Sequence, residues 1–147
     1  MREILFRGKR LDNGEWVASG NLLHANDNGI HSYYIPVYND KFGTIEDEHD
    51  NILSIEYGTF FKVDPATVGQ YTGLKDKNGK KIFEGDIWDC NGCIGVIKWV
   101  EEVCSFEANY VMHGIEYANA VSDYRAAKVE VIGNIHDNPE LLGGDES

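Results

Sequence analysis

The sequence predicts an all-β protein built from hairpins, and three observations support this prediction. Four Asn-Gly dipeptides lie along the 147 residues, and this pair is preferred in two-residue type I′ turns because both central positions need a positive φ. Alternating polar and apolar runs flank most of them, as in strands that bury one face. No long segment has helical periodicity, so we expect only short single-turn helices. The dipeptides are Asn13-Gly14, Asn28-Gly29, Asn78-Gly79 and Asn91-Gly92.

The first part of the chain is expected to form five strands, at residues 3–7, 15–23, 32–38, 52–55 and 59–63. The first two would form a hairpin about Asn13-Gly14. Pro36 cannot donate to a ladder, which favours a sheet edge or a bulge for the third strand. The polar stretches at residues 24–30 and 39–51 are expected to be loops.

Residues 64–67, Asp-Pro-Ala-Thr, have the pattern of a capped single turn, because Asp accepts from exposed N–H groups and Pro needs no acceptor at the first helical position. We place an internal boundary here. The prediction is two small, unlike β-sandwich or barrel-like units, residues 1–66 and 67–147, packed closely enough that they can also be counted as one domain.

The second unit is expected to contain a hairpin at residues 70–83 around Asn78-Gly79, followed by strands at residues 86–90, 93–100, 104–111 and 128–135. Residues 113–127 are ambiguous, because Tyr117, Val121 and Tyr124 have near-helical spacing whereas Gly114 interrupts it. Residues 137–142 have the pattern of a final capped turn.

The formal net charge is −12, and residues 101–147 contain two basic and ten acidic residues. Such an acidic surface would repel a phosphate backbone, so we do not expect direct nucleic-acid binding. Three cysteines, an odd number, are typical of reduced thiols rather than of a secreted disulfide framework. With no signal peptide or membrane-spanning run in the sequence, we expect a cytoplasmic protein without membrane contact.

Three stretches of the sequence together resemble the YopX family of small bacteriophage and prophage proteins. They are YTGLKDKNGKKIFEGDI at residues 71–87, VIGNIHDNPELL at 131–142, and REILFR at 2–7 with NGEWV at 13–17. The resemblance implies an all-β fold of two unlike units, a bacterial host cytoplasm, and a role that is uncharacterised. Since its motifs are turn and strand residues, it supplies no catalytic or binding residues.

The cysteines allow three interpretations. An Asn91-Gly92 turn would place Cys90 and Cys93 opposite each other at a separation that a disulfide can span, yet no helix follows to lower a thiol pKa. Cys90, Cys93, Cys104 and His113 also supply four ligands of the kinds that bind zinc, without close spacing in the second half. We expect unliganded reduced thiols and no cofactor; zinc and a redox pair are the alternatives.

The sequence supports three classes of function. Tyr- and Trp-rich strands with free edges favour a non-enzymatic accessory protein that associates with itself and with a host or phage protein. A modulator of nucleic-acid processes would bind directly, through basic clusters with Trp16 and Tyr71, or would compete for a basic partner. A metal-assisted hydrolase would use the acidic loop with Asp47, His49 and Asp50. No catalytic residue is predicted.

Overall fold

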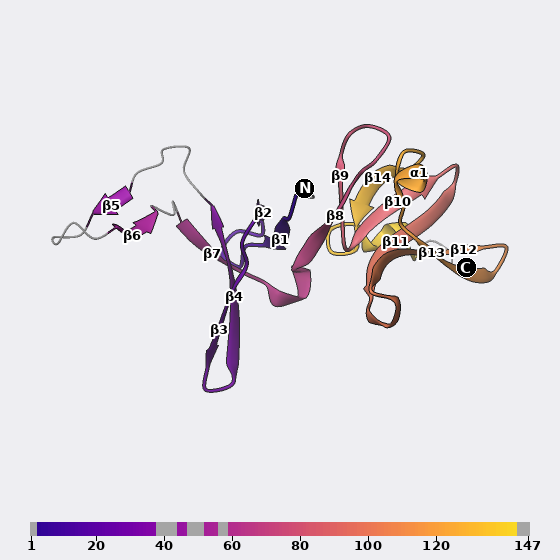
Figure 1. Cartoon of the computed structure of the whole chain (residues 1–147). Coiled ribbons are helices and arrows are strands. Elements are labelled where there is room, and N and C mark those ends of the chain that lie inside the picture. Colours follow the sequence, from indigo (N-terminus) through magenta and orange to yellow (C-terminus); the bar gives the residue numbers. More distant parts are fainter. Residues whose placement is uncertain (1–2, 38–43, 47–51, 56–58, 144–147) are drawn as a thin grey trace. The chain divides into compact units, whose positions relative to one another are not determined.

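The computed structural model describes residues 3–37, 44–46, 52–55 and 59–143 (Figure 1). Strands dominate, with only single-turn helices between them, which confirms the all-β prediction. The sheets are open rather than closed into barrels. The chain divides into two compact units, one spanning Leu5–Val68 and the other starting at Gly69 and also taking in the segment that ends at Ile4. The division lies after Val68, two residues beyond the predicted boundary.

The first unit is built from antiparallel pairs. A hairpin joins β1 and β2, a three-stranded sheet has the order β3-β4-β7, and β5 pairs with β6. The bounds are β1 Phe6–Lys9, β2 Trp16–Ser19, β3 Leu23–Asp27, β4 Ile30–Val37, β5 Thr44–Glu46, β6 Ile52–Ile55 and β7 Thr59–Val63, followed by the 3₁₀ turn η1 at Pro65–Thr67. Asp64 caps η1 by accepting from the Ala66 N–H, as predicted.

The prediction of a loop over residues 24–30 is wrong, because this segment contains strand β3. Asn28 and Gly29 have φ values of 51° and 87°, the two positive values of a type I′ turn. The turn pairs Asp27 with Ile30 and continues outward to Leu23 opposite Tyr34. Its residues are polar because both faces of this end of the hairpin are exposed, so no apolar alternation is needed.

Pro36 lies in β4, the central strand of its sheet, yet among the described residues it is paired with a strand on one side only. Strand β3 pairs with β4 no further than Tyr34, whereas β7 continues along β4 and pairs Phe60 with Pro36. The expectation of an edge strand or a bulge is therefore wrong for β4. The missing N–H of Pro36 still costs no ladder hydrogen bond, because an N–H at this position would point toward the β3 side, where the pairing with β3 has already ended.

The second unit contains the larger sheet, five strands in the order β13-β12-β11-β10-β14, and the antiparallel pair β8–β9. All the pairings are antiparallel. The bounds are β8 Gly69–Lys75, β9 Lys81–Phe83, β10 Asp86–Cys90, β11 Cys93–Val100, β12 Ser105–Met112, β13 Ile115–Ala120 and β14 Glu130–Asn134, with helix α1 at Asp123–Ala126 and 3₁₀ turns η2 at Glu101–Val103 and η3 at Pro139–Leu141.

Not every Asn-Gly dipeptide forms the expected type I′ turn. Asn91-Gly92 does, with both φ values positive, but at Asn13-Gly14 and Asn78-Gly79 only the glycine is positive. Around Asn78 the Asp76 N–H donates to the Lys80 carbonyl, which encloses a three-residue loop with the glycine in the left-handed position. Both dipeptides still lie in tight bends.

The ambiguous stretch at residues 113–127 contains a turn, a strand and a short helix. His113 and Gly114 form a further type I′ turn, with φ values of 54° and 77°, and it leads into β13. Ser122 then caps α1 by accepting from the Arg125 N–H. The near-helical spacing of Tyr117, Val121 and Tyr124 therefore spans a strand and a helix rather than one helix.

The hydrophobic core of the second unit lies on one face of the five-stranded sheet. Trp88, Ile97, Phe106 and Ala108 project from this face, and helix α1 contributes Ala126. Ile82 of β9, Val129 and Val131 complete the cluster. The Trp88 indole lies over Gly95, where an added Cβ would come within 2.3 Å of its Nε1. The absence of a side chain at Gly95 is thus what admits Trp88 to the core.

None of the helices in the described ranges has the length and hydrophobicity that a membrane crossing requires.

Candidate functional site

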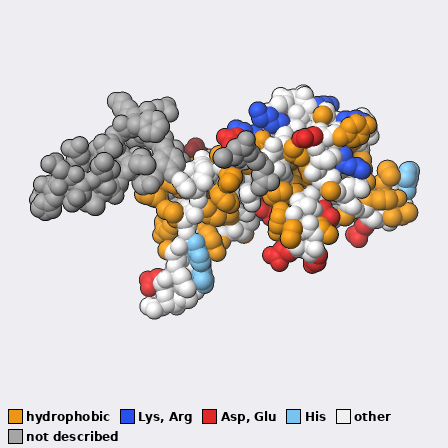
Figure 2. Space-filling model, in the orientation of Figure 1, with side chains coloured by type: hydrophobic (Ala, Val, Ile, Leu, Met, Phe, Trp, Pro, Cys, Tyr) orange, Lys and Arg blue, Asp and Glu red, His pale blue; other side chains and the backbone are white. Residues whose placement is uncertain are grey.

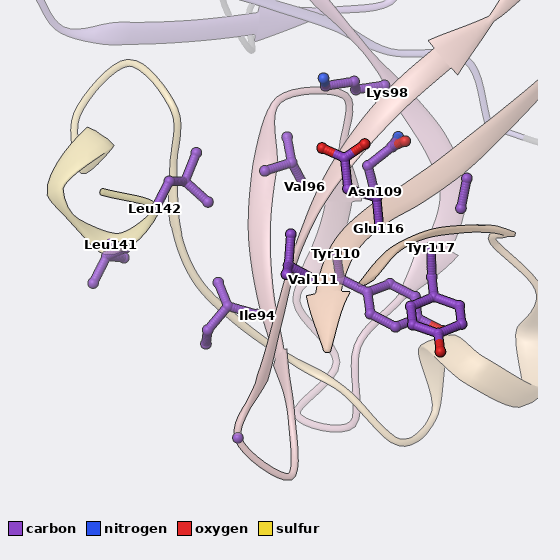
Figure 3. A pocket seen from close by; sticks show the side chains of 12 residues that line it. Ile94, Val96, Lys98, Asn109, Tyr110, Val111, Glu116, Tyr117, Leu141 and Leu142 are labelled. Atoms are coloured by element: carbon purple, nitrogen blue, oxygen red, sulfur yellow. The ribbon is translucent and has the colours of Figure 1, made fainter. Parts of the chain in front are cut away.

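The sheet of the second unit carries a groove of about 790 Å³ on the face opposite the core (Figure 3). Side chains alternate along a strand, so Ile94, Val96 and Lys98 of β11 share this face while Ile97 faces the core. Lys98, Asn109 and Glu116, from three neighbouring strands, are its polar groups. The rest of the lining is mainly apolar and consists of Gly92, Ile94, Val96, Tyr110, Val111, Tyr117, Ala118, Leu141 and Leu142.

Asn109 has an unsatisfied donor beside this groove. The register pairs it with Val96 on one side and Ala118 on the other, so its cross-strand neighbours are both apolar. Its Nδ2 is buried and has no hydrogen-bond partner among the described residues. A buried N–H without an acceptor costs about 1–3 kcal/mol. An oxygen acceptor brought by a binding partner would therefore be favoured here.

Strand β13 forms one edge of the five-stranded sheet, and its only strand neighbour in the described part of the chain is β12. The His113-Gly114 turn makes Met112 and Ile115 the first hydrogen-bonded pair. By alternation, Tyr117 also faces β12, whereas Glu116, Ala118 and Ala120 direct their backbone N–H and C=O groups away from the sheet.

Large apolar side chains surround this edge. Val111, Met112, Ile115 and Tyr117 each expose between 37% and 60% of their surface. Natural edge strands are commonly protected against pairing by lysine, proline or a bulge. Strand β13 has none of these, and its register against β12 is unbroken. Strand β13 is therefore a sheet edge without a partner strand among the described residues, and exposed apolar side chains lie around it.

The opposite edge of the sheet is closed by a buried carboxylate. Asp76 accepts from the Val131 N–H of β14 through one oxygen, and from the Asn78 and Lys80 N–H groups through the other. The Lys77 N–H also donates to the Val129 carbonyl. Burial alone would raise the pKa of Asp76, but these three backbone donors and the charge of Lys80 outweigh burial and lower it. Of the two edges, only β13 is left open by the described residues.

A second, smaller cavity of about 330 Å³ lies on the core side of the same sheet. Its walls are largely apolar, and two cations from the α1 region stand among its lining residues. The lining consists of Trp88, Cys90, Cys93, Tyr110, Met112, Tyr124, Arg125, Lys128 and Val129.

The comparisons with known proteins identify the family. The model of the YopX protein family matches residues 5–143, nearly the whole chain. The chain belongs to the YopX family. The crystal structure of protein EF1440 from Enterococcus faecalis is similar at 23% sequence identity, over 95% of this chain and 97% of that one, with a TM-score of 0.43. A search of curated proteins gave no match.

In the stretches that resemble the YopX family, polar groups form hydrogen bonds that stabilise turns. This explains why these stretches contain no recognisable catalytic or binding motif. Asp86 accepts from the Phe83 N–H, and the backbone of Gly85 bonds to both Ile97 and Ile135. Asn134 accepts from the two residues at 136 and 137. Together with Asp76, these polar groups fix the ends of β9, β10 and β14.

The four residues of the zinc hypothesis are not brought together. Cys90 and Cys93 are paired across the β10–β11 turn, as expected from the sequence, and both are free thiols. Cys104 follows η2, where β11 turns into β12, at the opposite end of these strands. His113 lies in the β12–β13 turn. Within the described ranges, no three His, Cys, Asp or Glu side chains gather as a metal site would require.

The environment of Cys93 does not activate its thiol. Burial raises the pKa of Cys93, and the negative charges of Cys90 and Asp89 raise it further. A nucleophilic or redox-active cysteine needs the opposite shift, toward the thiolate.

Two histidines meet on the β3–β4 hairpin, an arrangement that sequence reasoning missed. The Nε2 of His24 lies 2.7 Å from the Nδ1 of His31, and the Tyr33 ring stacks on His24. Figure 2 shows the histidine side chains together on this exposed hairpin. The Asn28-Gly29 turn was the available signal, because a two-residue turn there places residues 24 and 31 on one face.

The structure gives little support to the remaining residues predicted to bind nucleic acid or to catalyse hydrolysis. The prediction that Tyr71 offers a base-stacking surface is wrong, because its ring is buried against Phe83. The Arg7 guanidinium lies over the Trp16 ring, and Arg10 pairs with Asp12 at 2.5 Å. Asp47, His49 and Asp50 of the hydrolase hypothesis lie outside the described residues.

Proposed function

We propose that this YopX-family chain is a non-catalytic phage or prophage accessory protein that works through protein–protein contacts and pairs with a second copy of itself through strand β13. The open, apolar edge of the five-stranded sheet is the observation that carries the proposal. Unpaired N–H and C=O groups along such an edge are a template for another strand.

The edge is self-complementary in an antiparallel arrangement. A twofold axis perpendicular to the sheet at Tyr117 would place Glu116 of one copy opposite Ala118 of the other, and both residues direct their backbone groups outward. The two Tyr117 rings would then face each other, and no acidic residue of β13 would oppose another acidic residue. Such an axis keeps each face of the sheet on the same side in both copies.

Pairing would also place two copies of the groove on one continuous surface. Each groove offers apolar side chains and the unsatisfied Asn109 Nδ2. That combination suits a protein partner of the phage or host that brings apolar side chains and an oxygen acceptor, the usual content of a protein interface.

Sedimentation velocity across the micromolar range tests the self-association. We expect the mass to rise from that of the 16.5 kDa monomer toward twice that value. Ala118→Pro removes one outward N–H without removing a bond to β12, and it should weaken association about tenfold or more, the equivalent of losing about 1.4 kcal/mol.

Ala118→Ser is the matched control, because it keeps the N–H and a small side chain at the same position; it should associate like the parent. Circular dichroism establishes that both variants keep the sheet. A strict monomer at high micromolar concentration, or equal association of the proline and serine variants, overturns the proposed pairing. A hydrolase activity that is lost on replacing Asp47, His49 and Asp50 with alanine would overturn the non-catalytic part.

A further inference from the structure

We propose that the smaller cavity of the second unit binds a small apolar molecule that carries a carboxylate, with Trp88, Tyr110, Met112 and Val129 contacting the apolar body and Arg125 and Lys128 binding the anion.

The cavity is a built feature of the sheet. Trp88 lies against Gly95, and the wall continues with Tyr110 and Met112 at the end of β12. Val129, just before β14, is fully buried and closes the side toward the core. The volume of about 330 Å³ is within the range of small-molecule sites, which are mostly apolar with a few polar groups that fix orientation.

The distribution of charge identifies the ligand as an anion. Residues 101–147 contain only two basic residues, Arg125 and Lys128, against ten acidic ones. Both of these cations line the cavity, and the described residues that line it include no Asp or Glu. In a chain of net charge −12 this is a local reversal of sign, next to an apolar wall.

The two cations are placed to bind a carboxylate. The Lys128 Nζ lies 2.5 Å from the Tyr124 hydroxyl and 3.8 Å from the centre of its ring, which positions the ammonium at the cavity. An ammonium has three donors, so two remain for a ligand. Arg125 makes no side-chain ion pair within the described ranges, and its planar guanidinium matches a carboxylate in two parallel hydrogen bonds.

Cys90 and Cys93 line the same cavity and can report its occupancy. Cys104 is exposed and lies outside the lining, so it is an internal reference thiol. A molecule bound in the cavity would shield the first two thiols from alkylation and leave Cys104 unaffected.

The test uses the full chain and two matched probes, naphthalene carboxylate and the uncharged naphthalene carboxamide. Calorimetric titration should show binding of the carboxylate, and bound carboxylate should slow iodoacetamide alkylation of Cys90 and Cys93 but not of Cys104, as read by mass spectrometry. No carboxylate binding at millimolar concentration overturns the proposal. Binding that leaves the alkylation of Cys90 and Cys93 unchanged also overturns it, because the ligand is then elsewhere.

Variants distinguish the contribution of the two cations to binding from the contribution of the apolar wall. The double variant Arg125→Gln with Lys128→Gln should raise the dissociation constant of the carboxylate about tenfold, the loss of roughly 1.4 kcal/mol, and leave that of the carboxamide nearly unchanged. Both side chains are exposed, so the fold should persist. Lys75→Gln, at an exposed lysine of β8 that does not line the cavity, is the control and should bind like the parent. Equal loss for both probes, or equal effects of the control and the double variant, contradicts the assigned anion site.

Discussion

Gly95 determines how the core of the second unit is packed. The Trp88 indole occupies the space where any other residue would carry its Cβ. Protein interiors are packed so closely that one added carbon is felt by its neighbours. The same indole is a wall of the smaller cavity, so the glycine shapes both the core and the candidate ligand site.

Gly95→Ala should therefore destabilise the protein by about 1–3 kcal/mol, the usual cost of overpacking. Urea denaturation followed by circular dichroism measures this loss. Gly143→Ala is the control, because an added Cβ there meets nothing within 4 Å and should change the free energy of unfolding by less than about 0.5 kcal/mol. Equal stabilities of the two variants would show that Trp88 moves aside without cost.

Asp76 is the second residue with an effect beyond its own position. Its carboxylate is buried and accepts three backbone N–H groups, one of them 55 residues away at Val131. Asn has the same shape but only one acceptor oxygen. We expect Asp76→Asn to lower the free energy of unfolding by about 1–3 kcal/mol, because at least one buried donor loses its acceptor.

Lowering the pH should reduce the free energy of unfolding of the unsubstituted protein, because the Asp76 carboxylate becomes protonated. The pKa of Asp76 is lowered by folding, since its backbone donors outweigh the effect of burial. Its contribution to stability is then fully present above the ordinary value of 3.8 and is lost as the pH falls through the lower native value. In urea titrations from neutral pH into this acidic range, the stability difference between the parent and Asp76→Asn should shrink. A constant difference would contradict the shift.

At the scale of elements, glycine-containing turns were the part of the fold that could be predicted. Asn91-Gly92 forms a type I′ turn and places Cys90 opposite Cys93. At Asn78 the same dipeptide forms a longer loop, because the Asp76 carboxylate accepts from the loop N–H groups and selects another turn. Such a competing side-chain acceptor is not evident from the dipeptide alone.

Strand β13 and the sites beside it were beyond prediction. The turn before β13 is His113-Gly114, which is not one of the Asn-Gly or Asp-Gly pairs that mark a type I′ hairpin in a sequence. The groove depends on the register that sets Asn109 between Val96 and Ala118. The smaller cavity depends on pairing of β10 with β14, which are more than 40 residues apart. Pairing over such distances leaves no local pattern.

Gly92→Ala tests the type I′ turn of the β10–β11 hairpin. The φ of Gly92 is 89°, and open space surrounds its missing Cβ, so strain in the backbone is the only expected cost. The free energy of unfolding should fall by about 1–2 kcal/mol. Chemical denaturation compares this variant with Gly143→Ala. An unchanged stability would mean that the hairpin accepts another turn type at no cost.

At the scale of the whole molecule, net charge opposes self-association. Each copy carries a formal charge of −12, so two copies repel each other while β13 attracts through backbone pairing and apolar contact. The range of this repulsion falls from about 30 Å at 0.01 M salt to about 8 Å at 0.15 M.

Added salt should consequently strengthen the proposed dimer. Sedimentation at about 0.01 M and about 0.15 M sodium chloride should show a lower dissociation constant at the higher concentration. If contacts between opposite charges held the copies together, the trend would be reversed, and the apolar β13 edge would not be the interface.

The bond between Asp76 and Val131 also has a consequence for synthesis on the ribosome. Strand β14 is the last strand of the described residues, yet it pairs with β10, more than 40 residues earlier, rather than with β13, the strand before it in the sequence. The core cluster needs Val129 and Val131. A nascent chain that stops before residue 129 lacks both, as well as the donor that Asp76 binds. The second unit must therefore complete its folding late, after nearly all of its residues have emerged.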